Sequence, residues 1–185
     1  MIDSLQEIIT DKKLTRTDKN TLHSYIDQYY EEAFGPYRDK SINILEIGTR
    51  EGDSLRLWDV AFPKAEIWGI DNNIEPHLTE WVKGDRIHHV YGNAYDPILL
   101  ETLPIFDIVI DDGPHTEESQ LDCVKLYLKK LNEGGFIVIE DIQDFSTVEK
   151  LKQEYVKCGG TKPVDVYDLR KIKDRYDDVI VVLYK

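Results

Sequence analysis

The sequence is poor in cysteine, in positive charge and in long apolar runs. It has two cysteines among 185 residues, Cys123 and Cys158, and neither stands in a spacing typical of metal ligands or redox pairs. We therefore expect free thiols in a reducing compartment, which favours the cytoplasm. No apolar run approaches the ~20 residues that cross a bilayer. The N-terminus MIDSLQEIITDKK lacks the basic and apolar regions of a signal peptide, so we expect no membrane partner.

Positive charge is scarce, with 23 Lys and Arg against 36 Asp and Glu and a formal net charge of -13. The basic residues are scattered, so we expect no nucleic-acid partner. Hydrophobic residues make up 41% of the chain, which is ordinary for a globular protein, and the length is sufficient for one domain with its own core. A homo-oligomer stays open. We expect Trp58 and Trp81 to be exposed. Whether their rings pack within the chain or against a partner stays open.

Short β-branched runs alternate with longer amphipathic segments along the chain. Helical spacing predicts a helix over Thr116–Leu131, which Gly134 and Gly135 end, and another from about Asp18 to Phe34. Several strand candidates are continuously apolar, as in a parallel sheet covered on both faces. The seven expected strands are Ile42–Ile47, Glu66–Ile70, Ile87–Tyr91, Asp107–Asp111, Phe136–Glu140, Val164–Tyr167 and Val179–Tyr184. The pattern predicts an α/β fold with a Rossmann-like, doubly wound seven-stranded sheet.

The last two strand candidates are separated only by DLRKIKDRYDD. That segment is too short for a normal crossover helix, so we expect an antiparallel C-terminal hairpin. A last strand inserted antiparallel distinguishes this sheet from the all-parallel sheet of nicotinamide-binding domains. We expect residues 1–38 to form an N-terminal helical segment and residues 39–185 to form the α/β part of a single domain.

The loop after the first strand is the first candidate binding site, since ligands of such sheets lie beyond the carboxyl ends of the strands. Gly48 and Gly52 let the backbone turn tightly and approach a ligand. The dinucleotide fingerprint G-x-G-x-x-G is absent. Glu46 at the strand end suits a cationic or zwitterionic ligand instead. A generic strand-to-helix turn is the alternative.

Two further strand ends carry polar residues that suit a nucleoside. Asp71 follows the glycine loop by about 20 residues and could accept hydrogen bonds from ribose hydroxyls. A helix-capping role is the alternative for Asp71. The segment Gly92–Asp96 after the third strand is a candidate adenine contact, and a simple turn explains it equally well.

Acidic residues gather after the fourth strand, at Asp111 and Asp112 with His115, and after the fifth, at Glu140 and Asp141. Neighbouring carboxylates repel one another, so we expect a positive charge among them. Oxygen ligands without cysteine favour Mg²⁺, with Mn²⁺ and Ca²⁺ as alternatives. His115 could then take a proton from a hydroxyl whose pKa the metal has lowered. Alternatively, Asp112 and Asp141 cap helices and His115 is an ordinary loop residue.

Together these residues resemble the class I S-adenosylmethionine-dependent methyltransferases, with Glu46-x-Gly48-x-x-x-Gly52 as the first motif and Asp71 as the second. More narrowly, the sequence is similar to the macrocin and mycinamicin sugar O-methyltransferase family of antibiotic biosynthesis. This similarity spans roughly residues 17–185. Its segments are Thr17-Asp18-Lys19 with His23 and Tyr25, then ILEIGTREGDSL, IDDGPH, GGFIVIEDI, and Asp168-Leu169-Arg170 with Arg175-Tyr176-Asp177-Asp178.

The resemblance implies a methyl transfer from S-adenosyl-L-methionine, assisted by Mg²⁺ or another hard divalent cation, to a hydroxyl of a sugar or a glycosylated small molecule. It implies His115 and Asp112 as catalytic residues, and Asp112, Glu140 and Asp141 as metal ligands. It implies that residues 1–38 form a lid, which brings His23 and Tyr25 close to the site. The implied cofactor-binding residues are Thr17, Glu46, Gly48, Gly52, Ser54, Asp71, Asn72, Asn93, Ala94 and Asp111.

Three alternatives stay open. The N-terminal segment could simply pack on the sheet as a helix. A nicotinamide-dependent oxidoreductase or epimerase is a second function for such a sheet, although the G-x-G-x-x-G motif is missing and Tyr127 and Lys130 do not have Tyr-x-x-x-Lys spacing. A non-catalytic protein that binds S-adenosylmethionine is the third. The large antibiotic enzymes carry an extra N-terminal domain, so we do not carry macrolide specificity over.

Overall fold

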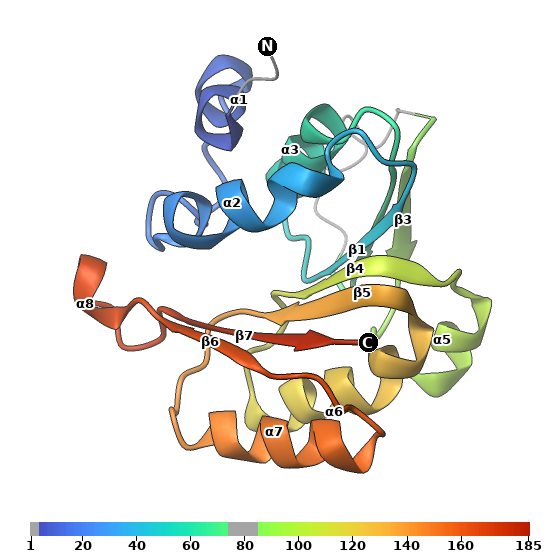
Figure 1. Ribbon diagram of the computed structural model, residues 1–185. Helices are drawn as coiled ribbons and strands as arrows, with labels where there is room; N and C mark the ends of the chain where they lie inside the picture. The colour runs from blue at the N-terminus through green and yellow to red at the C-terminus, as the bar shows by residue number, and fades with distance from the viewer. Residues whose placement is uncertain (1–3, 74–84) are drawn as a thin grey trace.

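The computed structural model describes residues 4–73 and 85–185. Their centre is a seven-stranded sheet in the order β3-β2-β1-β4-β5-β7-β6 (Figure 1). The strands are β1 Asn43–Ile47, β2 Glu66–Asp71, β3 Ile87–Tyr91, β4 Phe106–Asp111, β5 Leu131–Ile139, β6 Asp165–Asp168 and β7 Val179–Tyr184. Strands β1 to β5 pair in parallel, whereas β7 is antiparallel to both β5 and β6. The predicted doubly wound fold with an antiparallel C-terminal hairpin is confirmed.

Two layers of helices cover the sheet (Figure 1). The first layer consists of α1 Leu5–Lys12, the π-helix η1 Ile26–Tyr30, α2 Glu31–Phe34 and α3 Asp53–Ala61. The second layer, on the other face of the sheet, consists of α5 Pro97–Thr102, α6 Glu117–Tyr127 and α7 Thr147–Lys157. Short helices are the 3-10 turns η2 Gly35–Tyr37 and η3 Leu128–Lys130, and α8 Arg170–Lys173 at the projecting tip of the β6–β7 connection. No helix of the described residues has the length and apolarity to span a membrane.

The alternation of side chains along each strand divides the core between the two faces. In β1, Ile44 packs in the cluster under the N-terminal helices, whereas Leu45 and Ile47 pack in the cluster under α6 and α7. In β4, Ile110 belongs to the first cluster and Val109 to the second. The same alternation turns polar residues at the strand ends toward one helical layer or the other, which decides the layout of the site.

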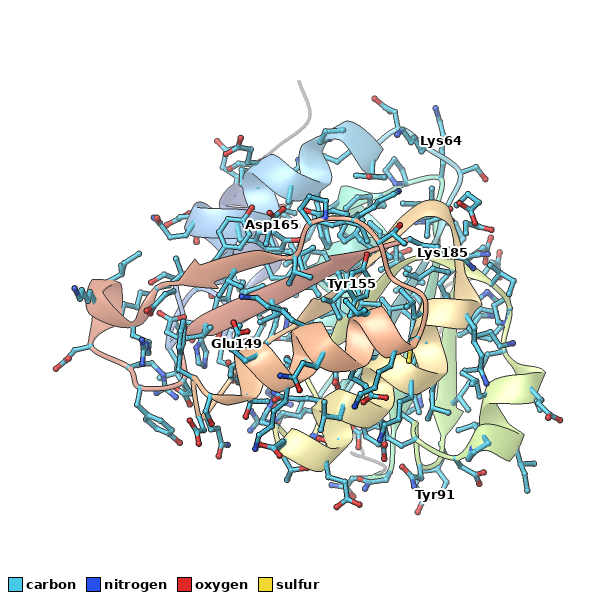
Figure 2. The ribbon with its side chains drawn as sticks, turned by 60° about the horizontal axis from the view of Figure 1, so that its bottom comes forward. Lys64, Tyr91, Glu149, Tyr155, Asp165 and Lys185 are labelled. Atoms are coloured by element: carbon cyan, nitrogen blue, oxygen red, sulfur yellow. The ribbon has the colours of Figure 1, made fainter. Side chains whose placement is uncertain are left out.

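A tyrosine of α7 forms a hydrogen bond between this helix and the end of β7. Tyr155 of α7 is 1% exposed, and its hydroxyl donates to the carbonyl of Tyr184 at 2.6 Å. Figure 2 shows Tyr155 where α7 packs on the strands, whereas the side chain of Glu149 on the same helix is 70% exposed. The amphipathic helix therefore also contributes a hydrogen bond to the last residues of β7.

The N-terminal segment differs from the helix predicted from Asp18 to Phe34. Residues 18–24 form turns, and helical structure begins only at η1. The turns let Lys19 and His23, which are 1% and 2% exposed, reach the strand ends. A further helix, α1, lies within residues 1–38, which were expected to be helical, but its bounds were not predicted, although Ser4 and Glu7 form a capping box at its start.

Two other expectations need correction. The predicted helix over Thr116–Leu131 ends earlier, in η3, and Leu131 already begins β5, so Gly134 and Gly135 lie within that strand, next to a register shift against β4. Trp58 is not at the surface: its ring is fully buried, 5.2 Å from that of Tyr30. Trp81 lies outside the described residues.

Candidate active site

A cavity of about 350 Å³ opens beyond the carboxyl ends of β1, β2, β3 and β4. This is the edge of the sheet at which the sequence predicted the ligand site. The predicted residues that line the cavity are Gly48, Asp71, Asn72, Asn93, Ala94, Asp112 and His115. Thr17, Gly52 and Ser54 line a smaller adjoining pocket of about 20 Å³, which shares Gly48 and Asp112 with the larger one.

The first two loops of the cavity are held together by backbone contacts. The Asp71 carboxylate accepts backbone N–H bonds from Arg50 and Asn73, both at 2.8 Å. A carboxylate has about four acceptor sites, so it can still accept hydroxyl groups from a ligand. Gly48 has a φ of +84°, and a Cβ there would overlap the carbonyl of Asp112. The loop after β1 thus packs directly on the loop after β4.

Two buried residues predicted to bind the cofactor, Glu46 and Asp111, line neither the cavity nor the adjoining pocket. Glu46 is fully buried and accepts a 3.0 Å hydrogen bond from Trp58 Nε1. Burial raises the pKa of Glu46, and Lys19 opposes the rise. Asp111 points to the other face, where the Tyr95 hydroxyl donates to it at 2.7 Å, and burial raises the pKa of Asp111 to about 6. Direct cofactor contact by either residue stays a prediction.

Asp112, His115 and Asp141 form a cluster beside the cavity, with one potential ligand atom of each lying within 4.8 Å of the others. The Nε2 atom of His115 is 3.8 Å from Asp112 Oδ1 and 3.6 Å from Asp141 Oδ2. His115 and Asp141 have φ values of +56° and +54°. Such strain outside glycine persists where the surroundings impose it and is frequent at functional sites. Burial raises the pKa of Asp141 to about 6.

Glu140, the third predicted ligand, is not brought into this cluster. Its Oε2 atom lies 2.7 Å from Lys19 Nζ, and its Oε1 atom accepts a hydrogen bond from the Tyr30 hydroxyl. The residue follows β5 on the face of the N-terminal helices, and it is 1% exposed. Both oxygens are therefore directed toward that layer. Metal ligation by Glu140 stays a prediction, and the positions of its two oxygens do not favour it.

Lys19 is the site residue that sequence reasoning missed, because it was noted only as part of a motif. Its Nζ atom lies 3.2 Å from Glu46, 2.7 Å from Asp112 and 2.7 Å from Glu140. Burial opposes the charge, but the three carboxylates raise the pKa of Lys19 well above its usual value. The chain thus supplies part of the positive charge expected among its acids. Strand alternation was the available signal, since it turns all three acids toward the N-terminal segment.

His23 and Tyr25 lie on the other side of the cluster, beside Asp141. The Tyr25 hydroxyl donates to Asp141 Oδ1 at 2.6 Å. The His23 ring stacks on Tyr25 at 4.6 Å, and its Nδ1 atom is 3.4 Å from both Asp141 and Asp178. The turns that follow Arg16 therefore place polar side chains against the strand ends. The expected role of residues 1–38 as a lid over the cofactor stays a prediction.

Comparison with known proteins identifies the type of domain. Residues 45–142 match a family model described as a methyltransferase domain. The chain is 34% identical over 139 residues to the 8-demethyl-8-alpha-L-rhamnosyl tetracenomycin-C 2'-O-methyltransferase of Streptomyces olivaceus, covering 69% of this chain and 35% of that protein. It is 34% identical over 133 residues to the demethylmacrocin O-methyltransferase of Streptomyces fradiae, covering 66% and 32%. The chain thus spans about a third of the length of these relatives.

A solved structure supports the fold. The MycE methyltransferase from the mycinamycin biosynthetic pathway, in complex with Mg and SAH (S-adenosylhomocysteine), superposes with a TM-score of 0.79 at 22% identity, covering 100% of this chain and 55% of that one. The family match also decides against the nicotinamide-dependent alternative. The chain belongs to the methyltransferase domain family, as its resemblance to class I S-adenosylmethionine-dependent methyltransferases implied.

Proposed function

We propose that the protein is an S-adenosylmethionine-dependent, divalent-metal-assisted O-methyltransferase that acts on a hydroxyl of a sugar or a glycosylated small molecule. One observation carries the proposal: Asp112 and His115 belong both to the acid–histidine cluster and to the wall of the cavity formed by the glycine loop. Relatives named as O-methyltransferases of glycosylated antibiotics support the acceptor class. The MycE complex with Mg and SAH supports the ligand pair.

The cavity fits the cofactor in size and in chemistry. Its volume of about 350 Å³ lies within the usual range of small-molecule sites. The Asp71 carboxylate is fixed by two backbone N–H groups and suits the ribose hydroxyls. Asn93 and Ala94 offer a separate wall for the adenine ring, and Gly48, which has no Cβ, lets the loop after β1 pack against Asp112 where both line the cavity.

The acid–histidine cluster fits a hard divalent cation. Asp112 and Asp141 each turn one oxygen toward His115 and have the other held by a side chain of the N-terminal segment. Carboxylate oxygens are the ligands that Mg²⁺ and Mn²⁺ prefer. A divalent ion bound by Asp112 and Asp141 would lower the pKa of an acceptor hydroxyl.

The chain's own groups then perform the proton transfer and the positioning. His115 Nε2 faces both carboxylates and takes the proton of the acceptor hydroxyl, and the two acids stabilise the imidazolium so formed. The oxygen attacks the methyl carbon of the sulfonium in line, and the sulfur keeps the electron pair of the broken bond. Holding the two reactants in this alignment supplies much of the rate.

The test measures transfer of a labelled methyl group from S-adenosylmethionine to a panel of hexoses, rhamnosides and sugar nucleotides. We expect EDTA to abolish transfer and Mg²⁺ to restore it, and Asp112→Asn or His115→Ala to lower kcat at least about 100-fold. Asp144→Asn, at a fully exposed acid, is the control and should not change the rate. Full activity of metal-free Asp112→Asn protein would refute the metal role. SAH binding without turnover on any acceptor would favour the non-catalytic alternative.

A further inference from the structure

A second cavity, of about 390 Å³, lies on the face of the sheet that the N-terminal helices cover. It opens between η1, α2 and η2 on one side and β5, β6 and β7 on the other. We call it the tyrosine cleft, because Tyr29, Tyr37, Tyr167 and Tyr184 line it together with Phe136. None of the residues that line it also lines the cofactor cavity or the small pocket beside that cavity. The tyrosine cleft is thus a separate hollow in the same domain.

Aromatic rings form the walls of the tyrosine cleft. The ring of Tyr29 lies 4.9 Å from that of Tyr167, and the ring of Phe136 lies 5.6 Å from Tyr37 and 6.0 Å from Tyr184. Tyr37, Tyr167 and Tyr184 are half-buried, so part of each ring is accessible. An aromatic ring offers a flat apolar face. The walls therefore suit a ligand that has a flat apolar face of its own.

The hydroxyl groups of the same tyrosines are free to bind a ligand. Tyr29 is 4% exposed, yet its hydroxyl has no hydrogen-bond partner within residues 4–73 and 85–185, although a buried tyrosine hydroxyl usually has one. Burial raises the pKa of Tyr29 well above its usual value, and the nearby Tyr184 and Tyr167 hydroxyls raise it further. The Tyr184 hydroxyl donates to Asp165 at 2.7 Å and can still accept. Hydroxyl groups thus gather at the cleft with unused donors and acceptors.

The rim of the tyrosine cleft is polar and carries both signs of charge, since the exposed Gln28, Glu32 and Lys40 line it. Lys40 Nζ lies over the Tyr37 ring, 4.4 Å from its centre. The chain thus places its own cation on one of the ring faces, and a cationic ligand there would be repelled. Glu32 and Asp165 disfavour an anion in the same way. The cleft therefore suits a neutral ligand that both donates and accepts hydrogen bonds.

We propose that the tyrosine cleft is a carbohydrate-binding site, distinct from the cavity in which methyl transfer is proposed. A sugar ring has an apolar face of C–H groups and a perimeter of hydroxyls that donate and accept. The aromatic rings cover that face, and the Tyr29 hydroxyl and the rim side chains bind the perimeter. The volume is within the usual range of small-molecule sites. This inference goes beyond the proposed function and depends neither on the metal nor on methyl transfer.

The test titrates ¹⁵N-labelled protein, saturated with SAH, with the methyl α-glycosides of glucose, galactose, mannose and rhamnose, and follows amide signals by NMR. With at least one glycoside, the signals of Gln28 and Ala33 should shift and saturate, because both residues line the cleft. The signals of Gly48 and Asn93, which line the cofactor cavity, should not follow that titration. The titration therefore locates the sugar as well as measuring its Kd.

Two substitutions test the roles of the hydroxyl and of the rings. Tyr29→Phe removes only a hydroxyl that bonds no described residue, so it should raise the glycoside Kd about twofold to tenfold and leave the Tm unchanged. Tyr167→Ala removes one wall and should raise the Kd at least about tenfold. Tyr91→Phe is the matched control: this tyrosine is 61% exposed on β3, away from the cleft, and its loss of a hydroxyl should not change the Kd.

Three results would overturn the inference: no saturable shift with any of the four glycosides, shifts only around His115 and the cofactor cavity, or a wild-type Kd in Tyr29→Phe. The last of these stays decisive if Tyr167→Ala does not fold. A dimer in sedimentation that Tyr167→Ala dissociates would assign the cleft to a second copy of the chain and overturn it as well. A chain that transfers no methyl group should still give the cleft titration, so this inference and the proposed function fail separately.

Discussion

Replacing Gly48 by alanine tests whether the cofactor loop and the metal loop form one packed unit. Gly48 has a φ of +84°, and an added Cβ would overlap the carbonyl of Asp112 and crowd Gly113 Cα at 2.8 Å. Gly134 offers a matched control, because its φ is +83° and an added Cβ would meet no atom within 4 Å. The two substitutions therefore share the backbone strain and differ in the contact.

The expected magnitudes follow from these two contributions. A left-handed conformation costs a residue with a Cβ about 1–2 kcal/mol, so Gly134→Ala should lower the free energy of unfolding by that amount. Overpacking adds about 1–3 kcal/mol, so Gly48→Ala should cost about 2–5 kcal/mol in total. Part of this strain will be relieved by moving the loop that lines the cavity, so Gly48→Ala should also weaken SAH binding.

Urea unfolding followed by circular dichroism gives the first quantity, and calorimetric titration with SAH gives the second. Gly134→Ala should leave the SAH Kd unchanged, because Gly134 lies in the first half of β5, whereas the cavity opens beyond the carboxyl ends of the neighbouring parallel strands. Equal destabilisation by the two substitutions, or unchanged SAH affinity in Gly48→Ala, would refute the packing of one loop on the other as the reason for this glycine.

Three further predictions concern single side chains. Burial lowers the pKa of His89 below its usual 6.5, so the unfolded chain binds the proton more tightly than the folded chain does. The free energy of unfolding should therefore rise as pH increases from the lowered pKa through 6.5. His89→Gln should flatten this slope in urea titrations. Trp58→Phe removes the donor to Glu46 Oε2 and should lower the free energy of unfolding by about 1–3 kcal/mol, measured the same way. Tyr25→Phe removes the hydroxyl that holds Asp141 and should weaken Mn²⁺ binding about tenfold in calorimetry.

The tryptophan and tyrosine predictions each have a control within the chain. Trp68→Phe loses an indole N–H that has no hydrogen-bond partner among residues 4–73 and 85–185, so it should cost less than Trp58→Phe. Tyr155→Phe loses a hydrogen bond to the distant Tyr184 and should leave Mn²⁺ binding unchanged. Equal costs for the two tryptophans, unchanged Mn²⁺ affinity in Tyr25→Phe, or a His89→Gln slope identical to wild type would each contradict the corresponding argument.

Local patterns were sufficient to predict the sheet and the loops that face the cavity. β-branched runs marked the strands. Ligands of such sheets lie beyond the ends of parallel strands, and the cavity lined by Gly48, Asp71 and His115 opens at that edge. The helix predicted from Asp18 was wrong because periodicity counts a lysine as a surface residue, and Lys19 is buried by acids from distant strands. Trp58 was misplaced although its helical spacing from Leu55 and Ala61 indicated the buried face.

The cluster was predicted only in part, for a physical reason. Adjacent carboxylates predict that some cation is present, but not whether the cation is an ion or a side chain. Lys19 stands 93 positions before Asp112 and 121 before Glu140. Pairing over such separations is decided by how the N-terminal turns pack on the finished sheet, which no local pattern contains.

These separations also bear on how the site is assembled while the chain is being made. Translation at about 5–20 residues per second puts roughly 6–24 s between the appearance of Lys19 and that of Glu140. The N-terminal segment, with apolar residues such as Ile26 and Phe34 that are fully buried in the finished protein, therefore waits without its partner surface for that time. Tyr25 waits longer still, because its hydroxyl also reaches the carbonyl of Asp177, 152 positions later. The N-terminal segment is thus made well before the strand ends on which it docks, and its contacts are complete only after Asp177 has been made.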